Sequence, residues 1–164
     1  MGKQNTIALV SGANRGIGLA IATGLARKGV NVLLGCRDLG RGEAASAALQ
    51  AEGLQVRPVQ LDTTDDASVS ALAALIGREY GRLDILINNA GIGLDYDPTL
   101  TVVERMQRTL AVNVLGTLRL TEAMLPLLKS ILPRGLLARS VLIIVMSLLL
   151  VQAVALQLFY GSHW

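Results

Sequence analysis

The chain has 164 residues, enough for one domain of ordinary size, and a formal net charge of +3. All 12 acidic residues lie before residue 131, where they face 13 of the 15 lysines and arginines, so this part is near neutral and unlike a nucleic-acid-binding surface. The single cysteine, Cys36, cannot form an internal disulfide, and no group of cysteines and histidines has the spacing of a metal site.

Apolar, strand-like runs alternate with helical patterns through the first 128 residues. In chain order, the pattern predicts a strand at 6–10, a helix at 17–28, a strand at 30–34, a helix at 40–53, a strand at 55–61, a helix at 65–81, a strand at 83–88 and a helix at 99–128. Pro58 places the third strand near the edge of its sheet, and Pro126 is expected to break the last helix. The order predicts an α/β fold, a partial doubly wound parallel sheet of about four strands covered by helices.

After residue 128 this alternation stops, and residues 140–160 form a run of 21 residues without charge. As a helix the run would be about 31 Å long, close to the thickness of a bilayer core. Basic residues precede it and aromatic residues lie at its far end: Lys129, Arg134, Arg139, Phe159, Tyr160 and Trp164. The run therefore predicts a membrane-spanning helix that keeps the N-terminal part in the cytoplasm, anchored in the inner or plasma membrane. The alternative is a core helix of a soluble domain.

A glycine-rich turn, "SGANRGIG" at residues 11–18, joins the first predicted strand to the first helix. Gly12 permits a tight turn, and Gly16 and Gly18 let the backbone approach a pyrophosphate at the helix N-terminus, where free N–H groups attract anions. An ordinary strand-to-helix turn is the alternative. The candidate cofactor-binding residues of this loop are Gly12, Asn14, Arg15, Gly16, Ile17 and Gly18.

The residues after the second strand bear on the choice of dinucleotide. A site for NAD usually places an acidic residue there, to bind the ribose 2′-hydroxyl. Here Arg37 comes first and could pair with a 2′-phosphate, joined by Arg15. Asp38 follows and could compete for the ribose. We expect NADP in preference to NAD, while solvated surface charges are the alternative for both arginines.

Two further motifs, "LDTTD" at 61–65 and "NNAG" at 88–91, follow the third and fourth strands, at the sheet edge where open α/β sheets bind ligands. Together with "SGANRGIG" and "VNVLG" at 112–116, they make residues 5–128 resemble the short-chain dehydrogenase/reductase family. The resemblance implies an NADP(H)-dependent oxidoreductase that transfers a hydride to or from a small carbonyl or alcohol substrate. It places Asp62 near the adenine, Asn89, Ala90 and Gly91 along the cofactor, and Asn113 as the catalytic asparagine that supports a proton relay.

The sequence departs from this family in its chemical half. The family pairs a serine with Tyr-x-x-x-Lys, because a hydroxyl must exchange a proton while the hydride moves. The three tyrosines, Tyr80, Tyr96 and Tyr160, have no lysine four positions on. We therefore expect a truncated dinucleotide-binding domain at 1–130 that lacks turnover, followed by a hydrophobic helix at 131–164.

The tail also resembles another family. Residues 131–164 are similar to the first transmembrane segment of osmosensor-type membrane histidine kinases, although no kinase domain follows. This suggests a hybrid chain with a junction near 129–131. Three functional interpretations stay open: an NADP-dependent oxidoreductase, a non-catalytic membrane-tethered NADP-binding module, and a non-functional fusion product that does not fold stably because its fourth strand is a bare edge.

Overall fold

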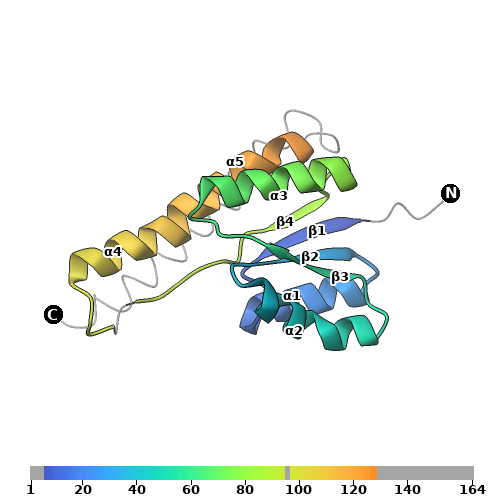
Figure 1. The fold of residues 1–164 in the computed structure, drawn as a ribbon, viewed down its shortest axis with the longest axis horizontal. Coiled ribbons are helices and arrows are strands. Elements are labelled where there is room, and N and C mark those ends of the chain that lie inside the picture. Colours follow the sequence, from blue (N-terminus) through green and yellow to red (C-terminus); the bar gives the residue numbers. More distant parts are fainter. Residues whose placement is uncertain (1–5, 95–96, 129–164) are drawn as a thin grey trace. The chain divides into compact units, whose positions relative to one another are not determined.

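The structure is a computed structural model that describes residues 6–94 and 97–128, so the predicted helix at 140–160 and the tail at 131–164 lie outside the described residues (Figure 1). The strands are β1 (Ile7–Ser11), β2 (Asn31–Cys36), β3 (Val56–Gln60) and β4 (Ile85–Ile87). The helices are α1 (Gly16–Arg27), α2 (Leu39–Ala51), α3 (Asp66–Glu79), α4 (Val102–Leu110) and α5 (Thr117–Leu128), and a π-helical segment, η1 (Ala111–Gly116), joins α4 to α5.

The four strands form one parallel sheet in the order β3-β2-β1-β4. The predicted α/β fold is confirmed, and β3, which contains Pro58, lies at the edge as expected. The fourth strand is shorter than predicted and only half-buried, so the prediction of a buried strand over 83–88 was wrong in both respects. Its apolar sequence reflects contacts with the core on each side, through Leu86 and Ile87.

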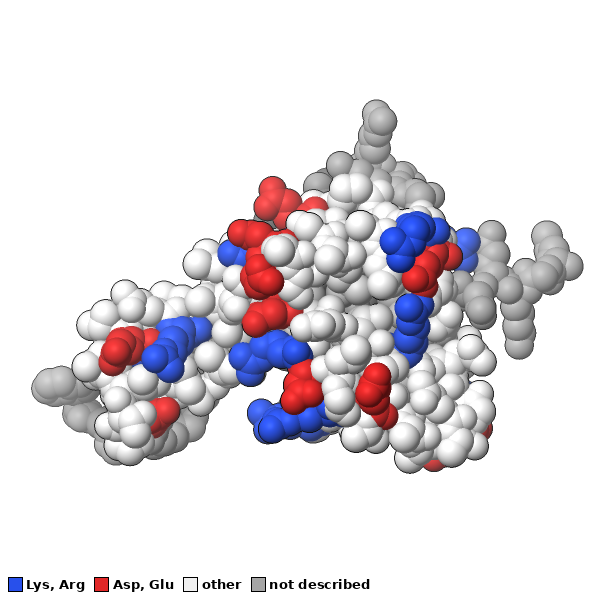
Figure 2. Space-filling model, viewed as in Figure 1, with Lys and Arg blue, Asp and Glu red and all other residues white. Residues whose placement is uncertain are grey.

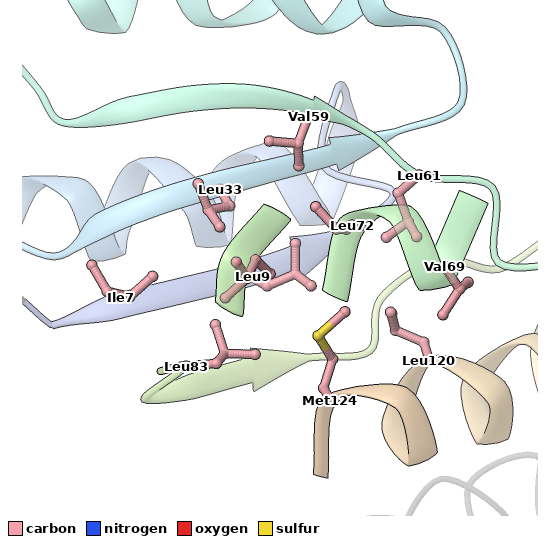
Figure 3. Packing of buried hydrophobic residues seen from close by; sticks show 11 residues of the cluster. Ile7, Leu9, Leu33, Val59, Leu61, Val69, Leu72, Leu83, Leu120 and Met124 are labelled. Atoms are coloured by element: carbon pink, nitrogen blue, oxygen red, sulfur yellow. The ribbon is translucent and has the colours of Figure 1, made fainter. Parts of the chain in front are cut away.

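Helices cover both faces of the sheet (Figure 1). One core lies between the sheet and the helices α3 and α5, where Val69, Leu72, Leu120 and Met124 pack against strand residues such as Leu9 (Figure 3). The other core lies on the opposite face, between the sheet and the helices α1 and α2. Because the central strands are buried on both faces, their apolar residues run continuously instead of alternating with polar ones.

Local signals in the sequence account for the helix ends. Asp38 and Asp65 cap the first turns of α2 and α3 by accepting backbone N–H groups. Three glycines with positive φ, at 82°, 78° and 69°, follow α1, α2 and α3: Gly29, Gly53 and Gly81. This left-handed conformation costs glycine little, and it stops each helix so that the chain turns toward the next strand.

The segment from α4 to α5 is one continuous helix, Val102–Leu128. The expected break at Pro126 does not occur, because α5 continues through this residue to Leu128. Within the described residues, Val102–Leu128 is the helix that is long and apolar enough to cross a membrane by length and composition alone. A helix that packs on a sheet passes the same test, and α5 buries Leu120 and Met124 completely in the core.

Candidate functional site

A cavity of about 340 Å³ opens at the carboxyl ends of the strands. Residues at or just after the ends of all four strands line this cavity. The sheet grows from β1 to β2 and β3 on one side, whereas β4 pairs with β1 on the other side, and open α/β sheets bind ligands at such a switch point. The eleven predicted cofactor-binding residues all line it: Gly12, Asn14, Arg15, Gly16, Ile17, Gly18, Arg37, Asp62, Asn89, Ala90 and Gly91. Five further residues, which were not among the predicted cofactor-binding residues, complete the lining: Cys36, Leu61, Thr63, Ile92 and Val112.

The glycines of the loop after β1 are required by how closely the chain approaches itself. A Cβ atom on Gly12, whose φ is +63°, would lie 2.9 Å from the Cα of Ala90. A Cβ atom on Gly18 would lie 2.4 Å from Asn89 Nδ2 and 2.6 Å from the Gly12 carbonyl oxygen. Gly16 has a φ of +56° and open space beside it, so it serves the turn and leaves the backbone accessible to a ligand.

Ser11, at the end of β1, joins this loop to the segment after β4. Its buried hydroxyl oxygen accepts the backbone N–H groups of Asn89 and Ala90, each at 3.0 Å, and the hydroxyl donates to the Ile87 carbonyl at 3.3 Å. Sequence reasoning did not identify Ser11 as part of the site. The feature that could have identified Ser11 is its position, as a polar residue at the end of an otherwise apolar, fully buried strand.

The N-terminus of α1 faces the cavity. Arg15 is the N-cap residue and makes no side-chain capping bond, so the N–H groups of the first turn keep their capacity to bind an acceptor. Arg15 itself is exposed at the rim, where its guanidinium can reach an anion. Such a helix start attracts the negative charge of a phosphate, and here it is reached through the open backbone at Gly16.

The choice between Arg37 and Asp38 is decided by the contacts of Asp38. The Asp38 carboxylate accepts the backbone N–H of Arg41 at 3.1 Å and pairs with Arg41 Nε at 3.4 Å, which fixes it as the cap of α2. Asp38 does not line the cavity, whereas Arg37 is exposed on its wall. The structure therefore presents a guanidinium, and no carboxylate from this turn, to a ligand at the end of β2.

Asp62 forms a compact turn at the end of β3. Its Oδ1 accepts the backbone N–H of Thr64 at 2.9 Å and the Thr64 hydroxyl at 2.7 Å. Burial raises the pKa of the Asp62 carboxyl, but the two bonds from Thr64 and the charges of Arg37 and Arg119 outweigh it, so the pKa lies below its ordinary value. Asp62 is thus held as a carboxylate, with its turn on the cavity wall.

Asn113 lies in η1 and is tied to the backbone of a residue that lines the cavity. Its Oδ1 accepts the N–H of Ile92 at 2.9 Å, and its Nδ2 donates to the Ile92 carbonyl at 2.9 Å. Asn113 does not itself line the cavity, and both ends of its amide are engaged. In this structure it holds the segment after β4 against the helix, and its predicted part in a proton relay stays a prediction.

Cys36 lines the cavity and is buried. Burial, followed by the nearby Asp38 charge, raises the pKa of its thiol above the ordinary value, against a backbone hydrogen bond from Gly42 that lowers it. The thiolate is therefore disfavoured. Within residues 6–94 and 97–128 there is no group of three acidic, cysteine or histidine residues that could hold a metal ion.

The geometry fits a dinucleotide phosphate. Gly12 and Gly18 permit a backbone cradle that side chains would fill, the start of α1 lies beside it, and two exposed arginines stand at the rim. Figure 2 shows acidic and basic side chains interspersed over one face of the molecule, without the continuous basic surface typical of nucleic-acid-binding proteins.

A family model described as short chain dehydrogenase matches residues 6–162. The chain is 42% identical over 136 residues to carbonyl reductase [NADPH] 1 of Sus scrofa, a match that covers 82% of this chain and 46% of that protein. It is 45% identical over 131 residues to carbonyl reductase [NADPH] 1 of Homo sapiens, covering 79% of this chain and 46% of that protein. The chain thus spans about half the length of the curated relatives that it matches.

The chain is also similar in fold and sequence to a solved structure. The chain superimposes on the RhlG/NADP active-site complex of Pseudomonas aeruginosa with a TM-score of 0.70 and 33% identity, covering 76% of this chain and 48% of that one.

Proposed function

The chain belongs to the short-chain dehydrogenase family, and on that premise we propose that the cavity at the carboxyl ends of its strands binds NADP(H). The observation that carries this proposal is the contrast between Arg37 and Asp38. Arg37 is exposed on the cavity wall, whereas Asp38 is engaged in capping α2 and pairing with Arg41. A 2′-phosphate finds a planar guanidinium at this position, and a ribose 2′-hydroxyl finds no free carboxylate.

The proposed binding divides the cavity between three groups of residues. The backbone of the loop from Gly12 to Gly18 and the start of α1 would bind the pyrophosphate. Arg37 and Arg15 would bind the 2′-phosphate, and the wall with Asp62 lies at the same end, because Arg37 is close enough to lower the pKa of Asp62. The segment from Asn89 to Ile92 would then border the nicotinamide half.

The proposed reaction type is hydride transfer between NADP(H) and a small carbonyl or alcohol, supported by the names of the carbonyl reductases that the chain resembles. The nicotinamide supplies the hydride when bound. A proton donor is needed as well, and the 164 residues contain no tyrosine with a lysine four positions on. We propose that this chain by itself binds NADPH and does not turn over carbonyl substrates.

The test is binding and turnover on the same preparation of the full chain. Titration with NADPH, followed by its fluorescence or by calorimetry, should saturate, and NADH should bind more weakly. A panel of aldehydes and ketones should then show no steady oxidation of NADPH. A folded chain that binds neither dinucleotide would contradict the binding proposal, and steady turnover would contradict the proposed lack of activity.

A membrane-tethered form of this module is a second candidate, and the uncharged run at 140–160 favours it. In this form the dinucleotide-binding part lies in the cytoplasm. The family model also matches across this run, which favours a place for the run within the family's domain. Fractionation of cells that express the chain separates the two: an anchored chain needs detergent for release, and a soluble one does not.

The resemblance of residues 131–164 to a membrane histidine kinase stays a prediction, and so does the junction near 129–131. If the chain is a hybrid, independent genomic sequence across this region should keep the junction and continue into a kinase reading frame. Continuation into a dehydrogenase reading frame would contradict it.

A further inference from the structure

Arg119 of α5 reaches from the helix to the turn after β3. Its Nη1 donates to the Thr63 carbonyl oxygen at 2.8 Å, and its Nε forms an ion pair with Asp66 in the first turn of α3. The Arg119 side chain is 28% exposed, whereas that of Asp66 is 83% exposed. The bond to Thr63 is therefore the better shielded of the two contacts, and exposed ion pairs contribute little.

Thr63 is also held by the same helical segment from a second direction. A Cβ atom on the buried Gly116, at the end of η1, would lie 2.7 Å from Thr63 Oγ1 and 3.0 Å from Thr63 Cβ. The helix backbone thus packs directly on the Thr63 side chain while Arg119 fixes its carbonyl. On the other side of the turn, Ser68 Oγ of α3 accepts the N–H of Asp62 at 2.9 Å.

Thr63 and Asp62 both line the cavity, whereas Arg119 does not. We infer that Arg119 is a positioning residue that sets the affinity for the adenosine 2′-phosphate half of NADP(H) by fixing the turn at Asp62 and Thr63. The inference rests on the proposed function, since it takes the cavity to be the NADP(H) site. It adds a residue outside the cavity, carried on a helix more than 50 positions further along the chain.

The experiment compares the full chain with its Arg119→Met variant, with NADPH and with 2′,5′-ADP, which carries only the adenosine 2′-phosphate half. Because one charge-assisted bond that orders the turn is lost, both dissociation constants should rise by the same factor, roughly fivefold to tenfold. Hydrogen exchange at residues 62–66 should become faster in the variant, while exchange in β1 stays unchanged. Arg119→Lys keeps the positive charge and can still donate a hydrogen bond to the Thr63 carbonyl, so it should recover part of the affinity.

Two control variants separate this role from a general loss of stability. Arg57→Met removes an arginine–carboxylate pair to Glu79 at the other end of α3, away from the cavity, and should leave both dissociation constants within about twofold. Asp66→Asn removes the ion pair but keeps the bond to Thr63, and it should also stay within about twofold.

The outcomes are distinct. If the unmodified chain binds NADPH and Arg119→Met binds it equally well, the inference is overturned and the proposed function stands. If Asp66→Asn weakens binding as much as Arg119→Met does, the route through Thr63 is overturned. If NADPH binding weakens while 2′,5′-ADP binding is unchanged, the assignment to the adenosine half is wrong. If the folded, unmodified chain binds neither ligand, the proposed function fails and the inference fails with it.

Discussion

Asn89 is joined to Ser11 through both its backbone and its side chain. The Asn89 backbone N–H donates to Ser11 Oγ at 3.0 Å, and Asn89 Nδ2 donates to the Ser11 carbonyl oxygen at 2.9 Å. The same Nδ2 also donates to the Gly12 carbonyl at 3.1 Å. The end of β1 is therefore hydrogen-bonded to the segment after β4, and both segments line the cavity.

Replacing Ser11 by alanine should weaken both the fold and dinucleotide binding. The change leaves the N–H groups of Asn89 and Ala90 without their acceptor in a partly buried place, and unsatisfied buried groups cost about 1–3 kcal/mol. Urea denaturation should show a loss of this size, and the dissociation constant for NADPH should rise. Ser11→Thr keeps the hydroxyl and should retain most of the affinity; equal losses in both variants would contradict the role of the hydroxyl.

Replacing Gly18 by alanine should weaken NADPH binding strongly, because the new Cβ would lie 2.4 Å from Asn89 Nδ2 and would force the loop away from the end of β4. Forced repacking of this kind costs roughly 1–3 kcal/mol. Gly24, in the same helix, has open space beside it, so Gly24→Ala is the matched control. It should bind NADPH normally and gain up to about 1 kcal/mol in stability. Calorimetric titration and thermal unfolding of both variants check this pair.

The sequence predicted the order of the elements well because continuous apolar strands and glycine-ended helices are local patterns. The length of β4 could not be read this way. Leu83 is buried and Asn88 is tied to α5 through Thr121, yet neither belongs to the strand, since pairing with β1 covers only Ile85–Ile87. Apolar residues indicate burial, and pairing depends on a neighbour that is distant in the sequence.

The same distinction holds in the site. Glycines that follow a strand give a local signal, and the loop at residues 11–18 was found from it. The link from Arg119 to Thr63 joins residues 56 positions apart, and a surface arginine has no pattern that reveals such a partner. The sequence could not decide for a similar reason whether Asp38 binds a ribose. It placed a carboxylate beside Arg37, and only the structure shows that this carboxylate caps α2 and pairs with Arg41.

Replacing Arg37 by alanine should change the preference between dinucleotides. Loss of a hydrogen-bonded pair with a 2′-phosphate is expected to weaken NADPH binding by roughly 10- to 100-fold, and NADH, which lacks that phosphate, should bind almost unchanged. Arg78, an exposed arginine on α3 that does not line the cavity, gives the matched control variant Arg78→Ala. Parallel titrations with both dinucleotides measure the ratio; an equal loss for NADPH and NADH would contradict a 2′-phosphate contact.

The lowered pKa of Asp62 predicts a stability difference that depends on pH. Burial raises this pKa, but the bonds from Thr64 and the charges of Arg37 and Arg119 together lower it by more, so the folded state favours the carboxylate. The stabilisation is complete above the pKa of an unfolded aspartate, about 3.9, and is lost as the pH falls through the lower folded value.

Asp62→Asn can still accept the Thr64 N–H but carries no charge. Unfolding free energies of the two proteins, measured from about pH 7 down to pH 3, should therefore differ most at neutral pH and converge below about pH 4. The carboxylates Glu79, Asp97 and Glu104, whose pKa values are also lowered, are common to both proteins and cancel in the comparison. A difference for Asp62→Asn that grew on acidification would show the opposite sign of coupling.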